Sequence, residues 1–120
     1  MLPQISITVD VADLSAATVF YMQALGCELK KKNSDDWAVL SVGALDINLL
    51  EKAAGTVAAA DQKRSYERHW TPIHFDFGVK DVAATATLVQ THGGSVEGET
   101  SANFAACVDP FGNGFCLVGA

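Results

Sequence analysis

Hydrophobic and polar residues alternate along residues 73–79, and the pattern of an amphipathic helix follows. Apolar side chains at 73, 75, 77 and 79 alternate with His74, Asp76 and Gly78, which predicts a strand with one apolar and one polar face. Asp81 then stands at a helix N-cap position, and Gly93-Gly94 supplies a residue that can end the helix in the left-handed conformation. Residues 72–99 therefore predict a strand, a capped helix and a returning strand.

The same pattern occurs near the N-terminus at an offset of 68 residues (73 minus 5). Residues 5–11 alternate, and a predicted helix begins at Leu14. Identical residues align at this offset: Ile5 with Ile73, Val11 with Val79, Asp13 with Asp81, Ala16 with Ala84 and Gly26 with Gly94. We interpret the chain as two copies of one module.

Each copy continues into three further predicted strands. They span residues 28–32, 37–42 and 45–50 in the first copy, and 95–99, 104–108 and 114–118 in the second. Pro110 and Gly112 suit the last turn, residues 109–113. The sequence thus predicts an α+β fold of two βαβββ modules in a single domain, 1–120. Module one is 4–51, the linker 52–71 and module two 72–119.

The linker is rich in alanine and then carries a polar and aromatic cluster with Arg64, Tyr66, Arg68, His69 and Trp70. One interpretation is a short helix that covers the edge of a sheet. The other is a lid or a dimer contact over a pocket, because a plain linker would rarely carry Trp, Tyr and two Arg together and such side chains are typical of binding surfaces.

Composition narrows the classes of partner. The chain has 120 residues, 49% of them hydrophobic, which is enough for one globular core. Its 14 acidic and 8 basic residues disfavour binding to nucleic acid or to anionic membranes. We expect no membrane span and no signal peptide, and we therefore expect the protein to be in the cytoplasm. The spacing of Cys27, Cys107 and Cys116 fits no zinc motif and favours three reduced thiols.

Three segments resemble the vicinal oxygen chelate superfamily, which contains glyoxalase I, bleomycin-resistance proteins and extradiol dioxygenases. The segments are VDVADLSAATVFYMQALG, HFDFGVKDVAATATLVQTHGG and DPFGNGFCLV. The last is the most specific, because an Asp-Pro-x-Gly-Asn turn before the final strand is characteristic of the superfamily. The resemblance implies a cupped, mostly antiparallel mixed sheet, the glyoxalase/bleomycin-resistance/dioxygenase fold, and dimers that complete the site.

The resemblance also implies where a metal would lie. Its ligands would come from the first and last strands of each module, at Ser6, Asn48, His74 and Cys116. Metal-dependent members typically have His, Gln or Glu there, and only His74 matches. Asp10 and Asp76 are on the same predicted faces but about 6.5 to 7 Å further along. We therefore expect no cofactor, with a divalent metal as the alternative.

Two of these residues could have a chemical role. His74, next to Asp76 on the polar face, could act as a general base, or it could be a buried, hydrogen-bonded histidine lining the cup; we favour the second interpretation. Cys116 could be a nucleophile, but the sequence places neither a cation nor a helix N-terminus beside it.

The favoured function is metal-independent binding of a small organic ligand by a homodimer. We expect the pocket to be lined by Ser6, Thr8, Asn48, His74, Asp76 and Cys116, with Trp37 and Trp70 as stacking surfaces. The acidic composition favours a cationic or polar ligand. The alternatives are a divalent-metal-dependent lyase or dioxygenase of the glyoxalase I type that uses His74, and a structural or regulatory dimer without a ligand.

Overall fold

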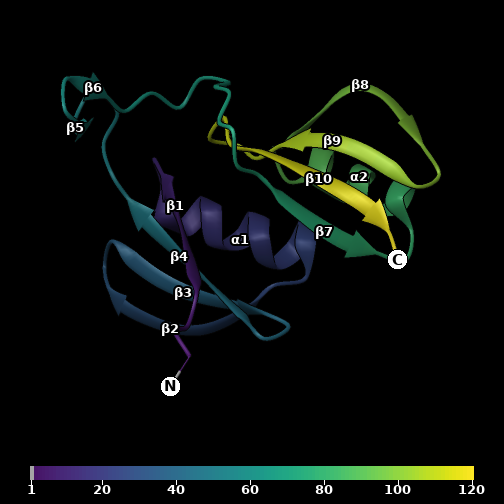
Figure 1. The fold of residues 1–120 in the computed structure, drawn as a ribbon, viewed down its shortest axis with the longest axis horizontal. Coiled ribbons are helices and arrows are strands. Elements are labelled where there is room, and N and C mark those ends of the chain that lie inside the picture. Colours follow the sequence, from purple (N-terminus) through teal and green to yellow (C-terminus); the bar gives the residue numbers. More distant parts are fainter. Residues whose placement is uncertain (1) are drawn as a thin grey trace.

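Two four-stranded sheets lie on either side of helix α1 in the computed structural model, which describes residues 2–120 (Figure 1). Module one contains β1 (Ser6–Val11), α1 (Leu14–Leu25), β2 (Glu28–Ser34), β3 (Trp37–Val42) and β4 (Leu45–Glu51). Module two contains β7 (Phe75–Val79), α2 (Val82–Thr91), β8 (Ser95–Ser101), β9 (Phe104–Val108) and β10 (Gly114–Gly119). The predicted α+β fold of two βαβββ modules is confirmed. Among the described residues, no helix is long and apolar enough to cross a membrane.

The two sheets have equivalent strand orders, β1-β4-β3-β2 and β7-β10-β9-β8. In each, the first strand of the module is at the edge and pairs in parallel with the last, whereas the other pairs are antiparallel. Thr8 lies opposite Asn48, and Asp76 lies opposite Cys116. Both residues of the second pair are 68 positions after those of the first, so the sequence offset is also an equivalence of strand register.

Local capping interactions explain where the helices begin and end. The side chains of Asp13 and Asp81 accept hydrogen bonds from the backbone N–H groups of Ala16 and Ala84, at 3.0 and 2.9 Å. Gly26 ends α1 in the left-handed conformation, with φ 72°. After α2, Gly93 adopts the left-handed conformation. Gly94 is instead a position of close approach, where a Cβ would lie 2.7 Å from the carbonyl oxygen of Val108. The aligned Gly26 and Gly94 therefore have different roles.

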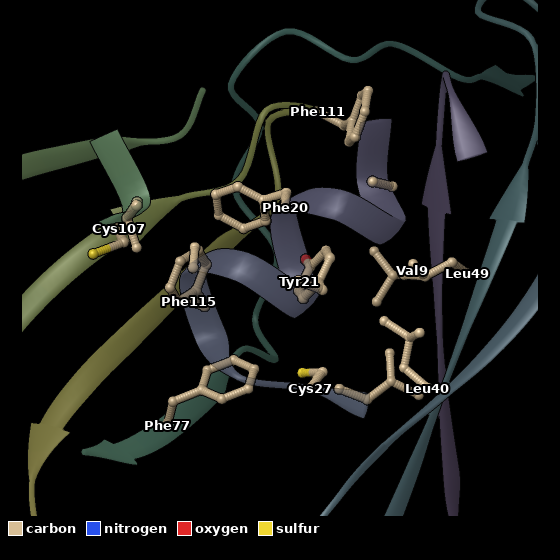
Figure 2. Close-up of a cluster of buried hydrophobic side chains, with 14 of the residues drawn as sticks. Val9, Phe20, Tyr21, Cys27, Leu40, Leu49, Phe77, Cys107, Phe111 and Phe115 are labelled. Carbon is tan, nitrogen blue, oxygen red and sulfur yellow. The ribbon is translucent and has the colours of Figure 1, made fainter. Parts of the chain in front are cut away.

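Helix α1 contributes side chains to a core that both modules share (Figure 2). Phe20 contacts Phe115 of module two edge to face, with ring centroids 6.2 Å apart. On the side of module one, the same core contains Val9, Leu40 and Leu49. Among residues 2–120, each sheet has a buried inner face and an outer face that no helix covers. Polar residues such as Thr8 and Asp76 point to these outer faces.

The structure corrects two expectations, one about the starts of the two modules and one about the linker. Ile5 and Ile73 continue the apolar alternation, but both precede their strands and are 77% and 79% exposed. Residues 52–74 of the described chain form no helix; instead β5 (Val57–Ala59) and β6 (Gln62–Lys63) form a short hairpin. The expected edge-covering helix was therefore wrong.

Candidate functional site

A depression of about 660 Å³ lies where the edge strands β1 and β7 meet the linker. Its lining combines the outer side of β1, the start of β7 and much of the linker, including Thr8, Asp10, Arg64, Tyr66, Trp70, Ile73 and His74. This volume is in the usual range for small-molecule sites, about 300 to 1,000 Å³. The linker therefore forms a wall of the depression rather than a plain connection between the modules.

Arg64 connects the linker to module one. Its Nε donates to Asp10 Oδ2 at 2.8 Å, and its Nη1 donates to the carbonyl oxygen of Val57 at 2.7 Å and to Thr56 Oγ1 at 3.2 Å. Tyr66 adds a hydrogen bond from its hydroxyl group to the carbonyl oxygen of Lys52, at 2.7 Å. One guanidinium group thus connects the hairpin to β1 at the edge of the depression.

Arg68 connects the next part of the linker to the outer face of module two. Its Nε and Nη2 donate to the two carboxylate oxygens of Glu97 on β8, at 2.8 and 3.0 Å. The hydrogen bonds from Arg68 lower the pKa of Glu97. The guanidinium group lies against Gly114, where a Cβ would be 2.9 Å from Nη2. A side chain at position 114 would displace this ion pair.

His74, Asp76 and Cys116 form a cluster on the outer face of module two. His74 Nε2 lies 3.2 Å from Asp76 Oδ1, and one nitrogen, oxygen or sulfur atom of each of the three residues lies within 4.8 Å of the others. The His74 side chain is 49% exposed, so the expectation of a buried histidine was wrong. His74 and Cys116 also line a hollow of about 110 Å³ beside Arg68.

The surroundings of Cys116 do not activate its thiol. Partial burial and the neighbouring Asp76 carboxylate both raise the pKa of Cys116. The thiol therefore stays protonated at neutral pH and is a poor nucleophile. Cys107 is buried on the opposite face of its sheet, and burial raises its pKa to about 11. Cys27, Cys107 and Cys116 are all free thiols.

Three of the predicted residues of module one, Ser6, Trp37 and Asn48, form a separate group. Trp37 Nε1 donates to Asn48 Oδ1 at 3.0 Å, and Asn48 Nδ2 lies 3.4 Å from Ser6 Oγ, to which it donates. The Asn48 amide thus already has partners for both its oxygen and its nitrogen. Of the predicted site residues, Thr8, His74 and Trp70 line the large depression, whereas the others, Ser6, Trp37, Asn48, Asp76 and Cys116, do not.

Sequence reasoning missed the connection between the modules made by the turn after β9. The buried carboxylate of Asp109 accepts a hydrogen bond from the hydroxyl group of Tyr21 at 2.6 Å. It also accepts from the backbone N–H groups of Phe111 and Asn113, at 2.8 and 3.0 Å. Asn113 Nδ2 reaches the carbonyl oxygen of Asp10 at 3.3 Å and lies 2.9 Å from Asp109 Oδ2. This turn therefore holds β1, α1 and β10 in position around the depression.

Comparisons with known proteins agree with this architecture. The sequence profile of the glyoxalase-like domain matches residues 6–118. Similar solved structures include hypothetical protein SA1046 from S. aureus, with 21% identity, a TM-score of 0.73, and 100% of this chain and 99% of that chain covered. They also include the fosfomycin resistance protein FosX from Listeria monocytogenes, with 18% identity and a TM-score of 0.73; the alignment covers 98% of this chain and 91% of that chain.

Glyoxalase I from Leishmania major, described as trypanothione-dependent, is also similar, with 21% identity and a TM-score of 0.73. The alignment covers 99% of this chain and 87% of that chain. A FosX variant from Listeria monocytogenes was crystallised with Mn(II) and a dihydroxypropylphosphonic acid. No curated protein matches the chain. At these identities the structural similarity concerns the fold.

Proposed function

The chain belongs to the glyoxalase-like domain family, within the vicinal oxygen chelate superfamily, and we propose that it binds a small organic molecule in the depression between β1, β7 and the linker. The observation that carries this proposal is the depression itself, which combines a suitable volume with polar, aromatic and titratable side chains. Thr8 on β1 and His74, one residue before β7, supply hydrogen-bonding groups, and Trp70 supplies an aromatic surface.

We propose that the working form is a homodimer. The outer faces of both sheets are open to solvent in one chain, and Trp70 and Ile73 at the depression are 80% and 79% exposed. Large apolar side chains exposed together are typical of interaction surfaces. A second chain that covers them would also close the depression, as the superfamily resemblance implies.

The test is a thermal-shift screen of small organic molecules followed by calorimetry with His74→Ala and Asp76→Ala. Because His74 lines the depression and Asp76 contacts it, we expect each variant to lose about 5- to 150-fold in affinity, corresponding to ~1 to 3 kcal/mol. The double variant should lose less than the sum, because the residues interact. His92→Ala, at the C-terminal end of α2, is the matched control. Wild-type affinity in both single variants would locate the pocket elsewhere.

A second candidate function is a divalent-metal-dependent lyase or dioxygenase of the glyoxalase I type. The four positions that the resemblance implies do not fit such a metal well, because Ser6 and Asn48 are neutral and bonded to each other. The observation that favours this candidate is the nearness of His74, Asp76 and Cys116. A third candidate, a regulatory dimer without a ligand, predicts no thermal shift with any compound.

A further inference from the structure

The charge of the large depression differs from the charge of the chain as a whole. The chain has 14 acidic and 8 basic residues. Of the described residues that line the depression, however, Lys63 and Arg64 are basic and Asp10 alone is acidic. The carboxylates of Asp61 and Asp76 do not line it. A molecule in the depression therefore meets a lining opposite in sign to the net charge of -6.

Arg64 has a nitrogen without a partner among residues 2–120. Its Nε donates to Asp10 Oδ2 and its Nη1 to Thr56 Oγ1 and the carbonyl oxygen of Val57, whereas Nη2 donates to no atom of those residues. The three bonds hold the side chain, which is 18% exposed, in one position. Lys63, its neighbour in the chain, forms no ion pair within the described residues. A fixed guanidinium group beside an ammonium group is well suited to a carboxylate.

The other end of the depression is lined by apolar and aromatic side chains. They belong to Trp70, Ile73 and Phe75, the last of which begins β7. Figure 1 shows the hairpin of β5 and β6 and the start of β7 at opposite ends of the linker. Lys63 and Arg64 therefore lie at one end of the depression and the apolar side chains at the other. This division suits a molecule with an anionic group and a flat apolar body.

We infer that the depression binds a small aromatic carboxylate, with its carboxylate group beside Arg64 and Lys63 and its ring against Trp70. This inference rests on the proposed function and adds the class of ligand. It differs from the expectation drawn from the acidic composition, which favoured a cationic or polar ligand. Asp10 and Arg64 together carry no net charge, so Lys63 leaves the lining positive.

Calorimetry with three compounds of nearly the same shape tests the inference. Naphthoate is an anion, naphthamide is neutral and naphthamidine is a cation at neutral pH. We expect naphthoate to bind about ten- to 150-fold more tightly than naphthamide, because hydrogen bonds to charged groups contribute that much. Naphthamidine should bind more weakly than both. Acetate, which has the charge but no ring, should give no measurable binding at the same concentrations.

Substitutions at the hairpin separate the effect of charge from that of the hairpin's attachment. Arg64→Gln should remove most of the preference for naphthoate over naphthamide, and Arg64→Lys should keep only part of it, because lysine lacks the planar fork. Since both changes also loosen the hairpin, Lys63→Gln provides a second measurement. It should weaken naphthoate by about 1.5- to 5-fold, the usual range for an exposed charge pair, and leave naphthamide unchanged. Lys31→Gln, on the exposed edge strand β2, is the matched control and should change neither.

Trp70→Ala tests the other end of the ligand. It should weaken naphthoate and naphthamide equally, by about two- to tenfold. Naphthamide or naphthamidine binding as tightly as naphthoate would overturn the inference but leave small-molecule binding in place. A preference for naphthoate that persists in both Arg64→Gln and Lys63→Gln would also overturn it, as would the absence of naphthoate binding at millimolar concentration. Failure of every compound in the thermal-shift screen as well would count against the proposed function itself.

Discussion

Tyr21 brings a hydroxyl group into the shared core, where Asp109 is its partner. The hydrogen bond is short, at 2.6 Å, and joins residues that are 88 positions apart. We expect Tyr21→Phe to lower the free energy of unfolding by about 2 kcal/mol, because hydrogen bonds to charged groups contribute ~1.5 to 3 kcal/mol. Chemical denaturation of the wild-type protein and the variant would measure this difference in the free energy of unfolding. Tyr66→Phe, which loses a bond at a half-buried site, is the control, and an equal loss there would contradict the special role of Tyr21.

The buried thiols predict how stability changes at alkaline pH. Burial raises the pKa of Cys27 and of Cys107 from 9.0 to about 11. As the pH rises, the unfolded chain loses these protons first, so the unfolded state is favoured. The stabilising contribution is therefore complete below pH 9 and is lost as the pH approaches 11.

Unfolding experiments between pH 7 and 10.5 should show this decline in stability. A variant with Cys27→Ala and Cys107→Ala should show a shallower decline, although its stability at pH 7 will be lower because of the lost packing. Burial and the Asp109 charge also raise the pKa of Tyr21, which adds to the decline above pH 10. A decline equally steep in the double variant would contradict a contribution from the thiols.

At the scale of elements, the hairpin of β5 and β6 depends on Arg64 for its attachment to module one. The guanidinium group of Arg64 forms an ion pair with Asp10 on β1. It also donates hydrogen bonds to Thr56 Oγ1 and to the carbonyl oxygen of Val57. We expect Arg64→Ala to speed hydrogen exchange and proteolysis within residues 56–64 while changing the melting temperature little, because the hairpin adds nothing to the shared core. Lys63→Ala is the matched control. Unchanged exchange in Arg64→Ala would contradict the attachment.

The elements differ in how far the sequence could predict them. Asp13 and Asp81 cap their helices through bonds to residues three positions away, so the signal is local and was readable. The hairpin of β5 and β6 could not be predicted in this way, because its turn places Ala60 at φ 53° without the glycine or asparagine that usually marks such turns. Its alanines favour a helix by propensity, and contacts made by Arg64 override that preference.

The candidate site shows the same division. The alternation of residues 73–79 predicted that His74 and Asp76 share a face, and the 68-residue offset predicted the equivalence of Asn48 and Cys116. The sequence did not reveal that Asp76 lies opposite Cys116. That register is set by the packing of Phe77, Phe115 and Leu117 in the core, which involves residues about 40 positions apart in the chain.

At the scale of the molecule, we predict a homodimer in solution. Light scattering at micromolar concentration should give twice the 12.6 kDa chain mass. Ile73→Glu should shift the protein toward the monomer, because it places a charge on a large exposed apolar side chain beside the depression. Leu88→Glu, a similar change on the solvent side of α2, should leave the dimer intact. A wild-type monomer at every concentration would contradict this prediction.

The shared core also has a consequence for the order in which the chain can fold as it is synthesised. Phe20 and Tyr21 of α1 find partners at Phe115 and Asp109, close to the C-terminus. The last strand of module two, β10, lies inside its sheet, between β7 and β9 (Figure 1). While residues 109–119 are still within the ribosome, one side of α1 therefore stays exposed and β7 and β9 have no strand between them. Native packing of either half is therefore completed only after residues 109–119 have emerged, and a chain without them would leave both halves open.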